Sequence, residues 1–227
     1  MRQVILDIET TGLEYTEGHK IIEIACIELS NYLPTGETYQ TYINPKRESS
    51  SSAKEKHGIS DEFLKDKKFF NEIVSDFLKF IKNSPIVAHN GVAFDIPFLN
   101  YELKFNKLNT ITNPIIDTLI LARKKFSGSP ANLDALCRRF DIDLSIRTKH
   151  GALIDTKLLA KVYLELKGGQ QPNLILSPKN DKKSKQEVKI SEKKILKDRK
   201  FVLSSIEEKK HEEFIKKIKN PIWNEYK

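Results

Sequence analysis

Cysteine is scarce in this sequence, and long apolar runs are absent from it. The 227 residues hold two cysteines, Cys26 and Cys137, both in apolar contexts and neither in a Cys-x-x-Cys motif. This pattern argues against disulfides and indicates reduced core residues of a cytosolic protein. No run approaches the roughly 20 apolar residues of a membrane span, and no basic leader with a cleavage site precedes the first apolar segment. We therefore expect a soluble, cytoplasmic protein with no membrane partner.

What the sequence does contain is an alternation of β-rich and helical segments. The β-rich runs cover residues 3–8, 21–29, 38–43, 85–89 and about 115–117. Such alternation predicts an α/β layered domain, and a chain of this length can hold one good core plus an additional segment. The early runs are close in sequence, so we expect hairpin pairing there, within a mixed sheet flanked by helices.

Two carboxylates lie at the end of the first β-rich run. Asp7 and Glu9 are two residues apart, so in a strand both project from one face, while Leu6 and Ile8 enter the opposite layer. Like charges this close repel and raise each other's pKa unless a cation lies between them. Hard divalent ions such as Mg²⁺ or Mn²⁺ fit oxygen ligands of this kind. The alternative interpretation is a solvated strand end.

Two further carboxylates are predicted at helix starts. Asp95 lies in the first turn of a helix expected over residues 94–104, and Asp155 opens an amphipathic helix with His150 just ahead of it. A neutral imidazole near a metal-bound water is a natural general base at neutral pH. Taken singly, Asp95 is equally explained as a helix-start carboxylate favoured by the macrodipole, and His150 as an exposed loop histidine.

Together these segments carry a family resemblance. DIETTGL, HNGVAFDIPFL and RTKHGALIDTKLLAKVY stand in the order found in the DEDD superfamily of 3′ to 5′ exonucleases, and they resemble the subtype with a histidine in its third motif. The resemblance implies a ribonuclease H-like fold and hydrolysis with two divalent ions, Mg²⁺ or Mn²⁺, that releases nucleoside 5′-monophosphates. It further implies four metal-binding carboxylates, Asp7, Glu9, Asp95 and Asp155, with His150 as the catalytic base.

The same resemblance suggests where the terminal nucleotide binds. Thr10, Thr11 and Leu13 directly follow the first metal pair, and the family uses this segment, with Asp7, Glu9 and Asp155, to meet the substrate. His57, in the HGI triplet, resembles a position in the family's substrate-side loop, although a histidine before a helix often only satisfies local backbone groups. His89 and Asn90 end a strand beside Asp95, which favours a role in the wall of the site.

The C-terminal part of the chain has a different composition. We predict an exonuclease domain at 1–172, a flexible linker at 173–194 rich in Lys, Ser, Glu and Asp, and an apolar tail at 195–227 with a helix over 205–219. The tail is too small to form its own core, so its apolar face needs a partner, and Trp223 is a plausible anchor. The alternative is packing of the tail against the first domain.

This layout resembles the proofreading-subunit family of bacterial replicative DNA polymerases. The resemblance implies that the tail binds the polymerase catalytic subunit and that the site receives DNA 3′ ends. Gln171, Leu174 and Leu176 also have the spacing of a sliding-clamp-binding peptide at 171–176. Nothing in the sequence indicates a homo-oligomer.

The distribution of charge along the chain favours an enzyme that a partner brings to its substrate. Residues 1–172 hold 23 Lys and Arg against 22 Asp and Glu, whereas residues 173–227 hold 16 against 9. A domain so near neutrality should bind nucleic acid weakly, through its metals and a local patch. Candidate patch residues are Arg138, Arg139, Arg147 and Lys149. The hypothesis is a 3′ to 5′ DNA exonuclease that edits mispaired primer ends; the alternatives are a free-standing exoribonuclease and a mainly structural polymerase subunit.

Overall fold

A five-stranded mixed sheet forms the centre of the N-terminal part of the chain. The computed structural model describes residues 1–145, 147, 149–169 and 204–219. The strand order is β3-β2-β1-β4-β5, with β1, β2 and β3 antiparallel and with β4 and β5 parallel to β1, which confirms the expected hairpins and mixed sheet. The strands are β1 (Arg2–Thr10), β2 (Ile21–Ser30), β3 (Leu33–Tyr42), β4 (Ile86–Ala88) and β5 (Ile115–Asp117).

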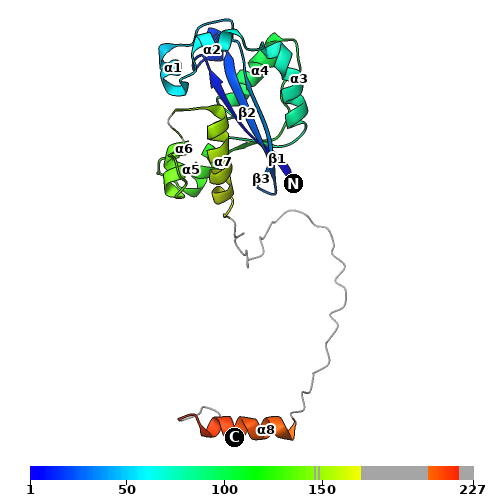
Figure 1. Ribbon diagram of the computed structural model, residues 1–227, viewed down its shortest axis with the longest axis vertical. Coiled ribbons are helices and arrows are strands. Elements are labelled where there is room, and N and C mark those ends of the chain that lie inside the picture. The colour runs from blue at the N-terminus through cyan, green and yellow to red at the C-terminus, as the bar shows by residue number, and fades with distance from the viewer. Residues whose placement is uncertain (146, 148, 170–203, 220–227) are drawn as a thin grey trace, which may run out of the picture. The chain divides into compact units, whose positions relative to one another are not determined.

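Helices cover both faces of this sheet (Figure 1). They are a short 3-10 helix η1 (Tyr15–Glu17), then α1 (Ser51–His57), α2 (Asp61–Lys65), α3 (Phe70–Ile81), α4 (Asp95–Phe105), α5 (Thr118–Lys125), α6 (Leu133–Arg139) and α7 (Ala152–Leu166). The helix expected over 94–104 is therefore displaced by one residue, and Asp155 lies in the first turn of α7 rather than at its first position.

Alternate side chains of β1 enter two different cores, as the period of a strand requires. Leu6 and Ile8 join the larger core beneath α3 and α4, which includes Phe77 and Phe98. Ile5 faces the other way and packs with residues of α7. Asp7 and Glu9 continue the Ile5 face of the strand, so the alternation of β1 directs both carboxylates toward the α7 side of the sheet.

A third apolar cluster packs α5, α6 and α7 together. It thereby fixes α7, the helix that carries Asp155. It contains Cys137, whereas Cys26 belongs to the core beneath α3 and α4. Both thiols are free and buried, as the sequence predicted. Burial raises the pKa of both, that of Cys137 to about 11.

The chain divides into two compact units, residues 1–175 and 176–227. In the second unit, α8 (Ser205–Lys216) begins at the N-cap Ser204, whose side chain and Glu207 form a capping box, and it ends three residues earlier than the sequence predicted. Ile206 and Phe214 of this helix are exposed. Among the helices that the structure describes, none has the length and apolar character needed to cross a membrane.

Several predicted features fall in residues 170–203 and 220–227, outside the described part of the chain. They include the linker, and the partner-binding residues Gln171, Leu174, Leu176 and Trp223. These remain sequence predictions.

Candidate active site

A cavity of about 240 Å³ lies where β1 ends and where α4 and α7 begin. It brings together residues from the three sequence motifs and from α1. Of the predicted site residues, Asp7, Glu9, Thr10, Leu13, His57, Asn90, Asp95, His150 and Asp155 line it. His89 lines it too, whereas Thr11 does not.

The carboxylates are held by regular structure rather than by loops. Asp7 and Glu9 lie opposite Ala25 and Glu23 in the antiparallel ladder with β2, and Asp95 and Asp155 occupy the first turns of α4 and α7. Asp95 and Asp155 are buried. Helix N-termini carry a partial positive charge, which favours a carboxylate at both positions.

Crowding of these acids shifts their pKa values upward. Burial, followed by the charges of Asp95, Glu9 and Asp155, holds the pKa of Asp7 well above its usual range. Burial and the charges of Asp155 and Glu23 raise the pKa of Glu9 to about 8. Burial also raises the pKa of Asp95, although the backbone N–H of Ile8 donates to it and opposes the shift. The cluster is therefore a costly concentration of negative charge that a cation would relieve.

The donor atoms fit a hard divalent ion. One atom each from Glu9, His150 and Asp155 lies within 4.8 Å of the others, and Asp7 and Asp95 line the same cavity. Carboxylate oxygens are the ligands that Mg²⁺ and Mn²⁺ prefer, so the acids of this cavity fit such an ion, with the His150 imidazole close beside it.

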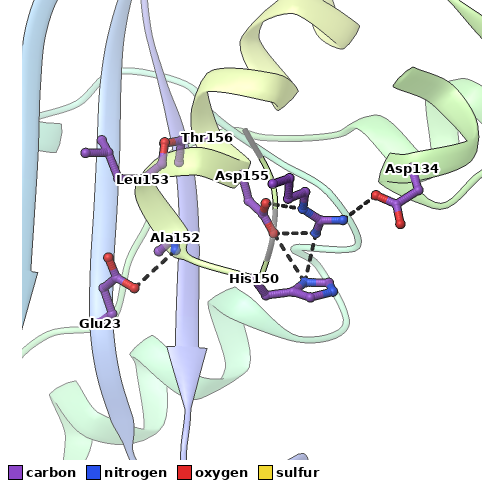
Figure 2. Close-up of polar contacts among 8 residues, drawn as sticks. Glu23, Asp134, His150, Ala152, Leu153, Asp155 and Thr156 are labelled. Carbon is purple, nitrogen blue, oxygen red and sulfur yellow. Dashed lines mark hydrogen bonds and ion pairs between the residues drawn. The ribbon is translucent and has the colours of Figure 1, made fainter. Parts of the chain in front are cut away.

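His150 and Asp155 contact each other (Figure 2). Both also contact a third residue, Arg147. His150 Nδ1 lies 3.3 Å from Asp155 Oδ2, and Arg147 donates to both oxygens of Asp155 at 2.6 Å and to His150 Nδ1 at 2.8 Å. Arg147 also forms an ion pair with Asp134 of α6. The prediction that Arg147 belongs to an exposed basic patch is wrong, because its side chain is only 8% exposed. Arg138 and Arg139 are exposed.

The segment before α7 is also attached to α1. The backbone N–H of His150 donates to the carbonyl of Lys56 at 3.1 Å. Gly58, which follows α1 with a φ of +70°, lies so close to Lys149 that a Cβ there would stand 2.4 Å from Lys149 Cδ. The cavity wall formed by His150 is therefore linked through the backbone to the wall formed by α1.

His57 presents a free donor in the wall of the cavity. Its Nδ1 accepts from the backbone N–H of Ile59 at 2.9 Å, which places the ring hydrogen on Nε2. Nε2 is buried and has no hydrogen-bond partner among the described residues. Burial lowers the pKa of His57, which keeps the ring neutral. A buried orphan donor in a cavity is a natural contact for a ligand.

The hydroxyl groups of the threonines after Glu9 form hydrogen bonds within the local turn. Thr10 Oγ1 donates to the carbonyl of Gly12 at 2.6 Å. Thr11 Oγ1 pairs with His19 Nδ1 at 3.0 Å and accepts from the backbone N–H of Lys20. Their side chains hold the turn that carries Leu13, which is 65% exposed at the cavity.

Two acidic residues outside the cavity lining hold elements of the site in place, and the sequence did not predict them. Asp117 caps α5 and accepts from the backbone N–H groups of Asn90 and Val92, so it fixes the loop on which Asn90 adopts a φ of +64°. Glu23 is buried on β2 and accepts from the backbone N–H of Ala152 at 3.1 Å (Figure 2). Both contacts join segments distant in sequence, so no local pattern revealed them.

Glu23 acts as the N-terminal cap of α7. The N-cap position is Gly151, which has no side chain to accept from the first turn. Glu23 supplies that acceptor from the sheet, and its second oxygen accepts from Gln40 at 2.7 Å. The start of the helix that carries Asp155 is thereby fixed to the strand next to Asp7 and Glu9.

Comparison with known proteins places this geometry among exonucleases. A family model described as Exonuclease (RNase_T) matches residues 4–163. DNA polymerase III subunit epsilon of Rickettsia typhi is 47% identical over 224 residues, which are 96% of this chain and 97% of that protein. The subunit of the same name from Escherichia coli K12 is 46% identical over 178 residues, 74% of this chain and 72% of that protein.

A solved structure shows the same fold. The nuclease domain of 3′hExo, described as a DEDDh family member bound to rAMP, matches with a TM-score of 0.61 at 19% identity, over 73% of this chain and 90% of that one. The ribonuclease H-like exonuclease fold expected from the sequence is confirmed by this match.

Proposed function

The chain belongs to the exonuclease family, among the epsilon subunits of DNA polymerase III, and we propose that it is the 3′ to 5′ proofreading exonuclease of a replicative DNA polymerase. In this role it removes mispaired nucleotides from primer 3′ ends in the cytoplasm and releases nucleoside 5′-monophosphates. The observation that carries the proposal is the convergence of His150 and four carboxylates, Asp7, Glu9, Asp95 and Asp155, on one cavity.

The four carboxylates are proposed as the ligands of two divalent ions, Mg²⁺ or Mn²⁺. The raised pKa values of Asp7 and Glu9 support this assignment, because such acids gain most from a cation. When bound, the ions supply positive charge that lowers the pKa of water and offsets the charge developing on the phosphate oxygens. Regular structure holds the ligands in place, so little reorganisation is needed.

His150 is proposed as the general base. Its side chain is half exposed at the cavity, close to Asp155 and within reach of a water there. It takes a proton from the attacking water as the new bond to phosphorus forms and the bond to the 3′ oxygen breaks. The 3′ oxygen that leaves acquires its proton from solvent.

The terminal nucleotide is proposed to contact the other walls of the cavity. His57 Nε2 donates a hydrogen bond to it, while Leu13 and Asn90 border the opening. Thr10 and Thr11 act through the turn that they stabilise, because their hydroxyl groups already have internal partners. Selectivity for mismatches then arises from fraying, since an unpaired terminus costs less to melt and reaches a single-strand site more readily.

The C-terminal region is proposed to recruit the enzyme. Residues 1–172 form the exonuclease domain, 173–194 the linker, and 195–227 the segment that binds the polymerase catalytic subunit. The exposed apolar side chains of Ile206 and Phe214 on α8 support this proposal. So does the Rickettsia typhi relative, which is named as a polymerase subunit and matches over 97% of its own length. The segment 171–176 is retained as a candidate sliding-clamp peptide.

A direct test follows degradation of 5′-labelled oligonucleotides by the purified chain. Mismatched primers, matched primers and RNA of one sequence are compared with Mg²⁺ or with EDTA, and Asp7→Asn serves as the inactive variant. Metal-dependent shortening from the 3′ end, fastest on mismatched DNA, is the expected result. Preference for RNA would instead assign the chain to RNA turnover and overturn the proofreading role.

A further inference from the structure

Arg147 occupies the ligand atoms that a metal ion would need. Its Nε and Nη2 donate to the two oxygens of Asp155, each at 2.6 Å, and Nη2 also donates to Nδ1 of His150 at 2.8 Å. The carboxylate of Asp155 is buried, and the guanidinium is nearly so. Bidentate contact of this kind is the strongest form of a charge-assisted hydrogen bond.

The same atoms belong to the group that can hold a cation. Asp155 and His150, with Glu9, are the residues whose donor atoms lie within 4.8 Å of one another. A guanidinium and a divalent ion repel each other at this separation, and each is stabilised by the same carboxylate. Both cannot keep full contact with Asp155 at once.

Arg147 also has an acceptor outside the cavity. Its Nη1 contacts Asp134 of α6, whose side chain is 40% exposed and does not line the cavity. If Arg147 released Asp155 it would keep this ion pair, so the arginine would not be left as a buried unpaired charge.

Release of Arg147 would also change the hydrogen bonding of His150. Arginine has only donors, so its contact with His150 Nδ1 uses the lone pair of that nitrogen and leaves the ring hydrogen on Nε2. Without Arg147, Nδ1 can carry the hydrogen and donate to Asp155 Oδ2, 3.3 Å away. Nε2 then has a free lone pair with which to accept a proton.

We propose that Arg147 is an internal counter-ion that competes with the divalent metal for Asp155, and that metal binding releases it from Asp155 and His150 and leaves it on Asp134, which it already contacts. This inference rests on the metal ligands assigned under the proposed function. It makes Arg147 a positioning residue that couples metal occupancy to the hydrogen bonding of the general base.

The test measures Mn²⁺ affinity of the full chain without DNA by isothermal titration calorimetry. Arg147→Lys keeps the charge but loses the bidentate grip, so we expect Mn²⁺ to bind it several-fold more tightly than the wild type, and Arg147→Gln more tightly still. Arg138→Gln, an exposed change on α6, controls for net charge. Asp134→Asn removes the alternative partner of Arg147 and should weaken binding.

Thermal melts in EDTA establish that each variant is folded before its affinity is compared. Unchanged or weaker Mn²⁺ binding by both Arg147 variants would overturn the proposal, and tighter binding by Asp134→Asn would overturn the transfer to that residue. Absence of Mn²⁺ binding in the wild type would contradict the proposed function itself, so the two failures are distinguishable.

Discussion

The acids of β1 make the site sensitive to pH. Because the pKa of Glu9 is raised to about 8, this carboxyl group must lose a proton to bind a cation. We therefore expect Mg²⁺ affinity to increase as the pH rises from 6 to 9. The half-saturating Mg²⁺ concentration for nuclease activity, measured at several pH values, tests this; an affinity independent of pH would show that Glu9 is already ionised at pH 6.

The same shift links pH to stability when metal is chelated. The pKa of Glu9 lies above its usual value of 4.5, so its contribution to stability is fully present below pH 4.5 and is lost as the pH rises through about 8. Melting temperatures in EDTA should fall across this window, whereas excess Mg²⁺ should restore them by binding the ionised form. A Glu9→Gln variant, which cannot ionise there, should show a smaller decrease.

Substitution of Asp7 separates catalysis from folding. Asp7→Asn should lower turnover by roughly 10³-fold or more, because several kcal/mol of metal-dependent stabilisation are lost. Its unfolding free energy in EDTA should rise, because the change removes a buried acid whose pKa is held well above its usual range by burial and by the neighbouring carboxylates. Primer degradation and chemical denaturation measure the two effects.

Asp76→Asn is the matched control for this change, because Asp76 is an exposed carboxylate on α3 that forms a surface ion pair with Lys79. It should change neither the turnover nor the unfolding free energy. A folded Asp7→Asn protein with normal turnover would remove Asp7 from the site.

Among the elements, α7 depends on a cap from another part of the chain. Glu23→Ala would leave the buried N–H of Ala152 without an acceptor, at a cost of about 1 to 3 kcal/mol in unfolding free energy. Turnover should also fall, because Asp155 lies in the same first turn. Glu23→Gln keeps an acceptor at this position and should recover most of the stability. Equal losses in both variants would mean that the charge of Glu23, rather than its hydrogen bond, is what matters.

How well the sequence predicts a contact depends on whether the contact lies within one element or joins distant elements. The face shared by Asp7 and Glu9 follows from the period of a strand, and the placement of Leu6 and Ile8 in the opposite layer is confirmed. Helix starts likewise placed Asp95 and Asp155 near one centre. These predictions succeed because each depends on residues within one element.

Contacts between distant elements were not predictable in this way. Glu23 lies 129 residues from its partner Ala152, and no local pattern joins them. Arg147 stands in a polar segment and was assigned to the surface, yet Asp134 and Asp155, from two helices, enclose it. The hydrogen bonds of the Thr10 and Thr11 hydroxyl groups likewise arise from the fold of the turn, and the contact of these residues with substrate stays a prediction.

At the scale of the whole molecule, the proposed function separates catalysis from recruitment. A chain that ends at residue 172 keeps every residue assigned to the cavity, so its activity on free single-stranded DNA should match that of the full chain. It should fail to co-purify with the polymerase catalytic subunit. Loss of nuclease activity on truncation would contradict the modular arrangement.

Phe214→Ala in the full chain tests the contribution of α8 to the same interaction. Phe214 is 61% exposed, and large aromatic side chains often dominate interfaces, so this change should weaken polymerase binding without changing turnover on free DNA. Lys210→Ala, on the same helix, is the matched control. Equal binding by both variants would place the contact elsewhere in the tail.

Because both of its cysteines are buried, the native protein should react little with thiol reagents. Thiol reagents attack the exposed thiolate, and Cys26 and Cys137 are both enclosed and have raised pKa values. Maleimide dyes should therefore leave the native chain unmodified. A single cysteine introduced at the exposed Ser205 of α8 would then carry the only label, and its fluorescence anisotropy would report when the tail is captured by the polymerase.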